Sequence, residues 1–315
     1  MRCKTKRKRQ LKKKCRSRKY RKVHKGGADK IKYFHWWSDP PSEAESNYFK
    51  TLLSGCIDRF DEVHVYTVFP LVTAETPVAS SSKILTIQYS AEPVFGEPTK
   101  FNINILPGEQ PDTDGFLTTP YMHMILWSKN PDMSLFTVAR KQTTPQPKFC
   151  LFSVSSETKE RTDFFHALST YKNIDSCGSV LNNLGYNCPG KYDSEEYYTF
   201  ISDYKFMICF ENTVIKNYAT EKLIIAYSSG TIPIYWGCPN IGDYVNMDAI
   251  LYLKPDYTEE DVQALIAEVR ALDEDEALYK KKFESIFFKD AIVPDAFDMD
   301  KLNASICAKI QAIPS

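Results

Sequence analysis

The hydrophobic positions of the chain alternate between short apolar runs and longer amphipathic segments from about residue 31 to residue 290. In the first half, four segments predict strands: IKYFHWW (31–37), DEVHVYTVFP (61–70), KILTIQYSAE (83–92) and FNINIL (101–106). In the second half, the strand predictions are KFCLFSV (148–154), DYKFMICF (203–210), TIPIYWG (231–237) and AILYL (249–253). Helical patterns cover 42–58, 158–170, 219–230 and 258–288. This strand–helix rhythm predicts parallel sheets covered by helices, an α/β fold.

Two domains are the simplest division of 315 residues with this pattern. The segment 141–148, KQTTPQPK, has the composition of a linker. We therefore expect an N-terminal domain over 31–145 and a C-terminal domain over 146–315 that ends in helices. Ligands of such folds bind beyond the carboxyl ends of the parallel strands.

The charge of the chain is unevenly distributed. Residues 1 to 25 contain 15 Lys and Arg and no acidic residue, whereas the rest of the chain contains 25 basic and 40 acidic side chains. A segment of this composition cannot bury enough apolar surface to fold, so residues 1–30 are predicted to be a disordered basic tail. Such a tail suits an anionic membrane surface or nucleic acid, or is a solvated extension with no partner. No apolar run is long enough for a membrane span, and we expect a cytoplasmic protein.

The nine cysteines include no C-x-x-C pair. Cys150 and Cys209 lie within apolar runs, which predicts reduced, buried thiols as in intracellular proteins. A Cys177–Cys188 bridge is the alternative. No His or Cys has the spacing of a zinc site, so no metal is expected.

The stretch FENTVIKNYATEKLIIAYSSGTIPIYWG (210–237) places several hydrogen-bonding side chains between two apolar runs. Glu211 and Asn212 follow a buried strand, and a helix capped by Thr220 and ended at Gly230 is predicted next. A helix N-terminus favours phosphate, Lys222 in its first turn adds a positive charge, and Glu221 can accept hydrogen bonds from sugar hydroxyls. This combination predicts a nucleotide-sugar site. The alternative is that Glu221 only complements the helix dipole and Lys222 is solvated.

The segment YKFMICFENTVIKNYATEKLIIAYSSGTIPIYWGCPNI resembles the signature of the α1,3-fucosyltransferase family, glycosyltransferase family 10. The resemblance extends upstream through RTDFFHALSTYKNIDSCGSVLNNLG and is closest to the short bacterial enzymes that carry no membrane anchor. It implies a fold of the GT-B type, in which two Rossmann-like domains face each other across a cleft. The implied donor is GDP-fucose. Its fucose is transferred with inversion of the anomeric configuration, without a metal or other cofactor.

The resemblance also assigns donor-binding roles. It implies that Arg161 and Lys222 stabilise the diphosphate leaving group. Asn212, Tyr218 and Glu221 fall on family positions that contact fucose, ribose or phosphate. The loop after Asn212 departs from close bacterial relatives by carrying TVIKN, with an additional positive charge at Lys216.

The general base is expected in the N-terminal domain. The family segment resembling Tyr-Thr-Gly-Glu corresponds here to QYSAEP, which gives Tyr89 as a donor-binding residue and Glu92 as the base. Ala91 replaces the usual Gly, and Glu97 is the rival for the base.

The expected function is transfer of fucose from GDP-fucose to a hydroxyl of a GlcNAc- or glucose-containing glycan, with an α1,3 linkage as the family default. One alternative is a transferase that uses another GDP-sugar. The other is a non-catalytic protein that binds sugars or, through its tail, polyanions. Family members in eukaryotes work in the Golgi, which is the alternative to a cytoplasmic location.

Overall fold

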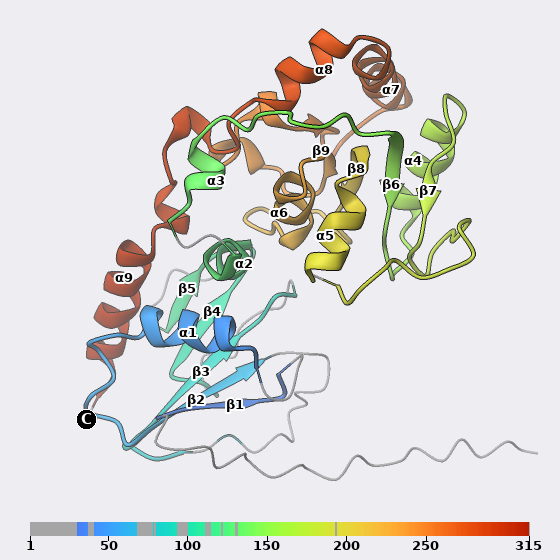
Figure 1. Ribbon diagram of the computed structural model, residues 1–315. Helices are drawn as coiled ribbons and strands as arrows, with labels where there is room; N and C mark the ends of the chain where they lie inside the picture. The colour runs from blue at the N-terminus through green and yellow to red at the C-terminus, as the bar shows by residue number, and fades with distance from the viewer. Residues whose placement is uncertain are drawn as a thin grey trace, which may run out of the picture.

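The computed structural model describes residues 30–36, 41–67, 78, 80–92, 100–110, 115–120, 122–129, 132–192 and 194–314. The basic tail and Glu97 lie outside these residues. The described chain forms two lobes, each built on a five-stranded parallel sheet (Figure 1). Within the described residues, no helix is long and apolar enough to cross a membrane.

The sheet of the first lobe follows the chain from edge to edge, in the order β1-β2-β3-β4-β5. Its strands are β1 (Ile31–Phe34), β2 (Glu62–Thr67), β3 (Ile84–Tyr89), β4 (Ile103–Leu106) and β5 (Phe116–Thr118). Its helices are α1 (Glu43–Leu52), α2 (Met122–Lys129) and α3 (Ser134–Thr137). A capping box between Ser42 and Glu45 starts α1. Alternate residues of β2 and β3, such as Val63 and Ile87, pack into one core with Phe49 of α1.

The second lobe contains a sheet ordered β10-β9-β8-β6-β7. Its strands are β6 (Lys148–Phe152), β7 (Asp175–Ser176), β8 (Tyr204–Phe210), β9 (Ile232–Trp236) and β10 (Leu251–Tyr252). Its α-helices are α4 (Lys159–Ser169), α5 (Glu195–Ile201), α6 (Glu221–Ser228), α7 (Glu259–Glu274) and α8 (Glu276–Phe283). Four short 3₁₀ helices are η1 (Ile241–Asp243), η2 (Met247–Ala249), η3 (Lys289–Ala291) and η4 (Asp295–Phe297). In register, Cys150 of β6 lies opposite Phe206 of β8, and Ile208 opposite Ile234 of β9.

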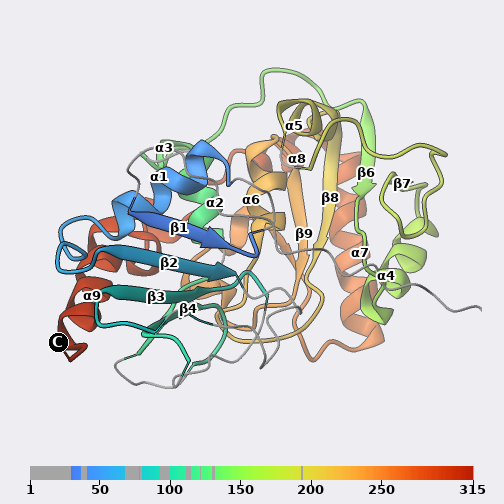
Figure 2. The ribbon, with the colours of Figure 1, turned by 90° about the horizontal axis from the view of Figure 1, so that it is seen from below.

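Strand β8 is buried on both faces, as its apolar sequence predicted. Met207 and Cys209 pack on one side with residues of α5 and α6. Phe206, Ile208 and Phe210 pack on the other with residues of α4 and α7. The second lobe is therefore a three-layer sandwich with helices on both faces of the sheet (Figure 2).

The strand order of the second sheet reverses between β6 and β8. β6 comes first in the chain, β7 pairs on one side of it, and β8 to β10 extend on the other. The loops after β6 and β8 therefore leave the sheet in opposite directions, and in α/β folds such a reversal marks the place where ligands bind, at the carboxyl end of the strands. In the first sheet the described strands show no such reversal.

The segment that joins the lobes runs to β6 and is anchored rather than loose. Arg140 is buried, and its guanidinium lies between the rings of Tyr227 and Phe283, at 3.7 and 4.2 Å from their centroids. It donates hydrogen bonds to the carbonyl oxygens of the same two residues, at 2.6 and 2.9 Å. The predicted linker thus begins with a fixed contact to α6 and α8.

The last helix, α9 (Met299–Ala312), returns to the first lobe, as Figure 1 shows. Leu302, Ile306 and Ile310 share the core of the first sheet. Asn303 donates to the carbonyl oxygen of Leu52 at 2.8 Å. The prediction that everything after residue 146 belongs to the second domain is therefore wrong for α9. Local composition cannot show this, because the apolar face of α9 would suit either core.

Four cysteines form disulfides, so the prediction of reduced thiols is wrong for them. Cys56 bonds to Cys307 of α9, 251 residues away, and Cys177 bonds to Cys188. Cys150, Cys209 and Cys238 are free and buried. The partner of Cys56 was not visible in the sequence because only the return of α9 brings Cys307 to it. With two disulfides, the argument from cysteines to a cytoplasmic location no longer holds.

Candidate active site

The candidate site lies at the carboxyl end of the second sheet, where the strand order reverses. The loop after β6 leads to Arg161 in α4, and the loop after β8 carries Glu211 and leads to α6. These two loops contact each other directly. The Arg161 Nε and Nη2 atoms donate to the carbonyl oxygen of Phe210 at 3.1 and 2.8 Å.

Glu211 organises the loop between β8 and α6. Its side chain is fully buried. Its Oε1 accepts the backbone N–H of Thr220 at 2.8 Å, and its Oε2 accepts the Thr220 hydroxyl at 2.7 Å. Lys222 Nζ lies 3.3 Å from Oε2. Burial, reinforced by the charge of Glu221, holds the pKa of Glu211 above its ordinary value, although Lys222 opposes this.

Gly237 makes room for Glu211. A Cβ at Gly237 would lie 2.5 Å from Glu211 Cγ and 2.7 Å from its Cβ, and the φ of +147° also disfavours a side chain. The glycine after β9 in the GTIPIYWG segment is therefore required by the carboxylate on the neighbouring strand.

The N-terminus of α6 lacks the side-chain cap that the other long helices carry. In α1, α4, α5, α7, α8 and α9, a Ser, Thr or Asp accepts a first-turn N–H. Thr220 occupies the N-cap position of α6, but its side chain makes no cap hydrogen bond: its hydroxyl donates to Glu211, and its oxygen accepts the ammonium of Lys222. The prediction that Thr220 caps α6 is wrong. The first-turn N–H groups of α6 stay available to a ligand, and an anion is the ligand that a helix N-terminus favours.

The charges at the start of α6 hold one another in place. Lys222 Nζ donates to Thr220 Oγ1 at 2.9 Å and lies 3.3 Å from Glu221 Oε1. Burial would lower the pKa of Lys222, but Glu221 and Glu211 outweigh it and the pKa lies above its usual value. Burial would raise the pKa of Glu221, but the Lys222 charge and the hydroxyl of Tyr192 keep it below its ordinary value. Both side chains are therefore charged at neutral pH.

Arg161 is 2% exposed and held by backbone oxygens. Besides the two bonds to Phe210, its Nη1 donates to the carbonyl and hydroxyl oxygens of Ser156 at 2.8 and 2.7 Å. Four of its five N–H groups are thereby used, which leaves one without a partner among the described residues. Burial lowers the pKa of Arg161, and the charge of Glu211 opposes this. Arg161 is thus a positioned cation with one donor to spare.

Asn212 and Tyr218 complete the loop. The Tyr218 hydroxyl donates to Asn212 Oδ1 at 3.1 Å, and Tyr218 is 2% exposed. Burial raises the pKa of Tyr218, and the charges of Glu211 and Glu92 raise it further. Glu92 lies just beyond β3 in the first lobe. Because its charge acts on Tyr218, Glu92 is close to the loop between β8 and α6 of the second lobe. Glu92 is partly exposed, and its backbone N–H donates to Ser90 Oγ at 3.0 Å.

Tyr89 lies elsewhere. It is 1% exposed, and its ring packs against Phe49 and Trp36 in the core of the first lobe, with centroids 5.1 and 6.2 Å away. This packing gives no support to a contact of Tyr89 with the donor, which stays a prediction. An aromatic residue at the end of a strand points to a ligand or to the core according to its position in the two-residue repeat, and Tyr89 shares the inward face with Leu85 and Ile87.

Sequence reasoning missed two contributors. Glu211 was noted as part of the polar stretch but not as the residue that holds it together; its position directly after a buried strand was the available signal. Tyr192 donates to Glu221 Oε1 at 2.7 Å from 29 residues upstream. No local pattern indicated this contact. Across the described residues, no group of three His, Cys, Asp or Glu could hold a metal ion.

The polar loop also contacts the first lobe. The backbone N–H of Gly108 donates to the carbonyl oxygen of Asn217 at 3.2 Å, and the N–H of Met122 to that of Ala219 at 3.2 Å. Lys216 pairs with Glu109 at 3.3 Å between exposed side chains. The loop between β8 and α6 therefore forms the wall of the site and part of the junction of the lobes.

Comparison with solved structures shows the fold. A crystal structure of an α1,3-fucosyltransferase superposes with a TM-score of 0.65 and 21% identity, covering 89% of both chains. One described as holding GDP-fucose superposes with a TM-score of 0.61 and 20% identity, covering 93% of this chain and 95% of that one. The chain thus has an α/β fold of the GT-B type.

Three curated relatives match parts of the chain. A putative fucosyltransferase of Acanthamoeba polyphaga mimivirus is 27% identical over 249 residues, 72% of this chain and 39% of the relative. An α-(1,3)-fucosyltransferase of Helicobacter pylori is 44% identical over 107 residues, 30% of this chain and 21% of the relative. The human GDP-fucose protein O-fucosyltransferase 3 is 34% identical over 131 residues, 40% of this chain and 26% of the relative. The matches span less than two fifths of the length of each relative.

The family model "glycosyltransferase family 10 (fucosyltransferase) C-term" matches residues 138–314, more than half of the chain. This range contains both loops of the candidate site. The chain therefore belongs to glycosyltransferase family 10, the fucosyltransferase family.

Proposed function

We propose that the protein transfers fucose from GDP-fucose to a hydroxyl of a GlcNAc- or glucose-containing glycan, with inversion and with an α1,3 linkage. The observation that carries this proposal is the uncapped N-terminus of α6 beside Lys222 and Arg161. The family of the chain gives the donor class. The α-(1,3) name of the Helicobacter pylori relative supports the linkage.

The donor end has the parts that a departing diphosphate needs. Lys222 and the first-turn N–H groups of α6 can bind one phosphate, and the spare N–H of Arg161 can reach a neighbouring oxygen. Lys222 is balanced by Glu211 and Glu221, so a bound phosphate would compete with these carboxylates for its ammonium. As the bond from fucose to the phosphate breaks, the growing negative charge strengthens the interaction with both cations.

Glu92 is the proposed general base. It lies beyond a strand of the opposite lobe, near enough to Tyr218 for its charge to raise the pKa of that phenol. In the reaction, the acceptor oxygen attacks the anomeric carbon from the face opposite the diphosphate, and Glu92 takes the acceptor proton. Asn212, Tyr218 and Glu221 would contact the sugar or the ribose. No step in this scheme needs a metal ion.

The test is an assay of GDP release from GDP-fucose with lactose, N-acetyllactosamine, chitobiose and a folded protein acceptor. Wild type is compared with Glu92→Gln and with Glu43→Gln, a control at an exposed position of the same lobe. We expect acceptor-dependent release by wild type and the control, and a loss of at least 100-fold in Glu92→Gln with unchanged GDP binding. NMR of the product reports the anomeric configuration and the linkage.

Four other results would each contradict a different part of the proposal. Full activity of Glu92→Gln would exclude Glu92 as the base and leave Glu97 as the candidate. GDP binding without transfer to any acceptor would favour the non-catalytic alternative. Turnover of another GDP-sugar in preference to GDP-fucose would change the donor. Transfer to the protein acceptor alone would indicate a protein O-fucosyltransferase, the activity for which the human relative is named.

A further inference from the structure

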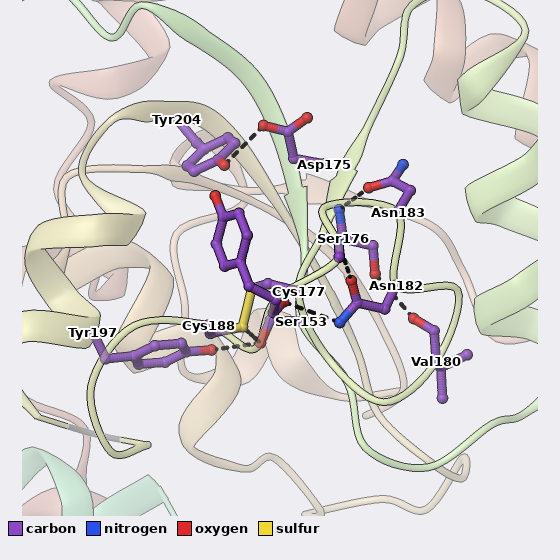
Figure 3. Close-up of a disulfide and its surroundings, with 12 residues drawn as sticks. Ser153, Asp175, Ser176, Cys177, Val180, Asn182, Asn183, Cys188, Tyr197 and Tyr204 are labelled. Atoms are coloured by element: carbon purple, nitrogen blue, oxygen red, sulfur yellow. Dashed lines mark hydrogen bonds between the residues drawn. A yellow bond between two sulfur atoms is a disulfide. The ribbon is translucent and has the colours of Figure 1, made fainter.

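A disulfide closes the loop that follows β7 and fixes it beside the candidate site. Cys177 comes directly after β7, and Cys188 returns to it. Cys188 Sγ lies 3.0 Å from Ser153 Oγ, and the Tyr197 hydroxyl donates to the same Ser153 oxygen at 2.9 Å (Figure 3). Ser153 directly follows β6, the strand that leads to Arg161. The loop is thus attached to the end of β6, on one side of the candidate site.

Inside the bridge, the loop is held by its own hydrogen bonds. Asn183 Nδ2 donates to the carbonyl oxygen of Ile174 at 2.7 Å, and its Oδ1 accepts the N–H of Ser176 at 2.8 Å (Figure 3). The N–H of Cys188 donates to the carbonyl oxygen of Cys177 at 3.1 Å. The chain therefore leaves the bridge in a defined position, four residues before Tyr192.

The hydroxyl of Tyr192 is hydrogen-bonded to Glu221, although the residue is largely exposed to solvent. The hydroxyl donates to Glu221 Oε1 at 2.7 Å, and the side chain is 54% exposed. The ring of Tyr197 lies 5.3 Å from it, centroid to centroid. A large aromatic ring that is fixed in orientation yet open to solvent is a low-entropy surface for stacking a flat ligand group.

The order of groups along the site matches the order of groups in a nucleoside diphosphate. Lys222 and the α6 N-terminus face phosphate, Glu221 is adjacent, and Tyr192 lies beyond Glu221. A diphosphate is followed by a ribose, whose two hydroxyls suit a carboxylate, and then by a planar base. The hydroxyl of Tyr192 occupies one oxygen of Glu221 and leaves the carboxylate oriented.

We propose that Tyr192, held by the Cys177–Cys188 loop, forms the nucleoside side of the donor site: its hydroxyl orients Glu221 toward the ribose, and its exposed ring stacks on the base. The proposal rests on the proposed function in that the ligand is a GDP-sugar. It concerns nucleotide binding alone, so it can be judged even if no acceptor is found.

The test compares GDP with inorganic pyrophosphate, which lacks the nucleoside, as ligands measured by calorimetry and by competition. We expect Tyr192→Ala to raise the Kd for GDP about 30-fold and Tyr192→Phe, which keeps the ring, about fivefold. Pyrophosphate binding should change less than about twofold in either. Tyr186→Ala is the control, because Tyr186 lies within the Cys177–Cys188 loop, six residues before Tyr192, and is similarly exposed, at 50%. It should bind GDP as wild type does.

A double variant, Cys177→Ser with Cys188→Ser, tests the role of the bridge. It should raise the Kd for GDP several-fold with the same sparing of pyrophosphate, because Tyr192 loses its anchor. If the double variant does not fold, the Tyr192 variants decide. In active protein, they should raise the KM for GDP-fucose and leave kcat within about threefold.

Unchanged GDP binding in Tyr192→Ala overturns this proposal and leaves the proposed function intact. Equal losses of GDP and pyrophosphate binding also overturn it, because they indicate a general collapse of the site. Absence of GDP binding in wild type overturns both proposals. GDP binding without transfer contradicts only the proposed function.

Discussion

The two lobes each contain a five-stranded parallel sheet, yet among the described strands the order reverses only in the second sheet. In the second lobe, the reversal lies between the neighbouring strands β6 and β8. Most residues of the candidate site lie in the two segments that follow these strands. In the first lobe, the order β1 to β5 is monotonic, and one face of the sheet carries buried polar residues such as His64, Gln88 and Asn104. This difference favours the proposal that the second lobe holds the donor, with Glu92 proposed as the contribution of the first lobe from a strand end.

The largest effect should come from Glu211, on which the second lobe's loop depends. Replacing it with Ala removes one of the two carboxylates that pair with Lys222 and the acceptor of both Thr220 donors, which leaves the buried Thr220 N–H and hydroxyl unsatisfied. We expect the free energy of unfolding to fall by about 3–5 kcal/mol and GDP binding to be lost. Chemical unfolding and calorimetry of Glu211→Ala and Glu211→Gln would measure this.

Glu268→Gln is the matched control, because Glu268 is 51% exposed and pairs with Lys282 in the same lobe. It should change stability by less than about 1 kcal/mol. A Glu211→Gln variant with wild-type stability and wild-type Kd for GDP would show that the loop is held by its backbone and not by this carboxylate.

The sequence predicted the second lobe better than the first for a physical reason. β8, its polar loop, α6 and β9 are contiguous, so the pattern of burial and the Gly230 helix end could be read locally. Gly230 has φ +76°, and the Thr231 N–H donates to the carbonyl oxygen of Ala226, as in a Schellman motif. These features depend on residues within a few positions of each other.

The parts that sequence could not give depend on distant segments. α9 returns to the first lobe, Cys56 meets Cys307 across 251 residues, and Tyr192 reaches Glu221 across 29. The burial of Tyr89 has a different cause: the alternation of side chains along β3 turns Tyr89 toward the core of the first lobe. The roles of Arg161, Lys222 and Glu92 in the reaction stay predictions.

In the first lobe, a buried histidine should make the stability of the protein depend on pH. His123 of α2 is fully buried, its Nδ1 lies 2.8 Å from the Tyr48 hydroxyl, and its Nε2 has no partner among the described residues. Burial lowers the pKa of His123 to about 3. In the unfolded chain His123 therefore binds a proton near pH 6.5, whereas in the folded chain it stays neutral. The free energy of unfolding accordingly falls as the pH drops below 6.5.

Between pH 7 and pH 5, this single group should reduce the free energy of unfolding by about 2 kcal/mol. Urea unfolding at the two pH values measures the loss, and His123→Phe should remove it. His166→Gln, at an exposed position of α4, is the control and should keep the wild-type dependence. If His123→Phe keeps the full loss, the acid sensitivity lies outside the α1–α2 contact.

The smallest effect is expected where the lobes touch through exposed charges. Lys216 and Glu109 are 55% and 67% exposed, so solvent screens their 3.3 Å pair. We expect Lys216→Ala to change stability by less than about 0.5 kcal/mol and to leave kcat unchanged. The backbone contacts of Gly108 with Asn217 and of Met122 with Ala219 remain in this variant and can hold the loop against the first lobe. A several-fold loss of kcat at low salt that disappears at high salt would show instead that this ion pair sets the distance between Glu92 and the donor loop.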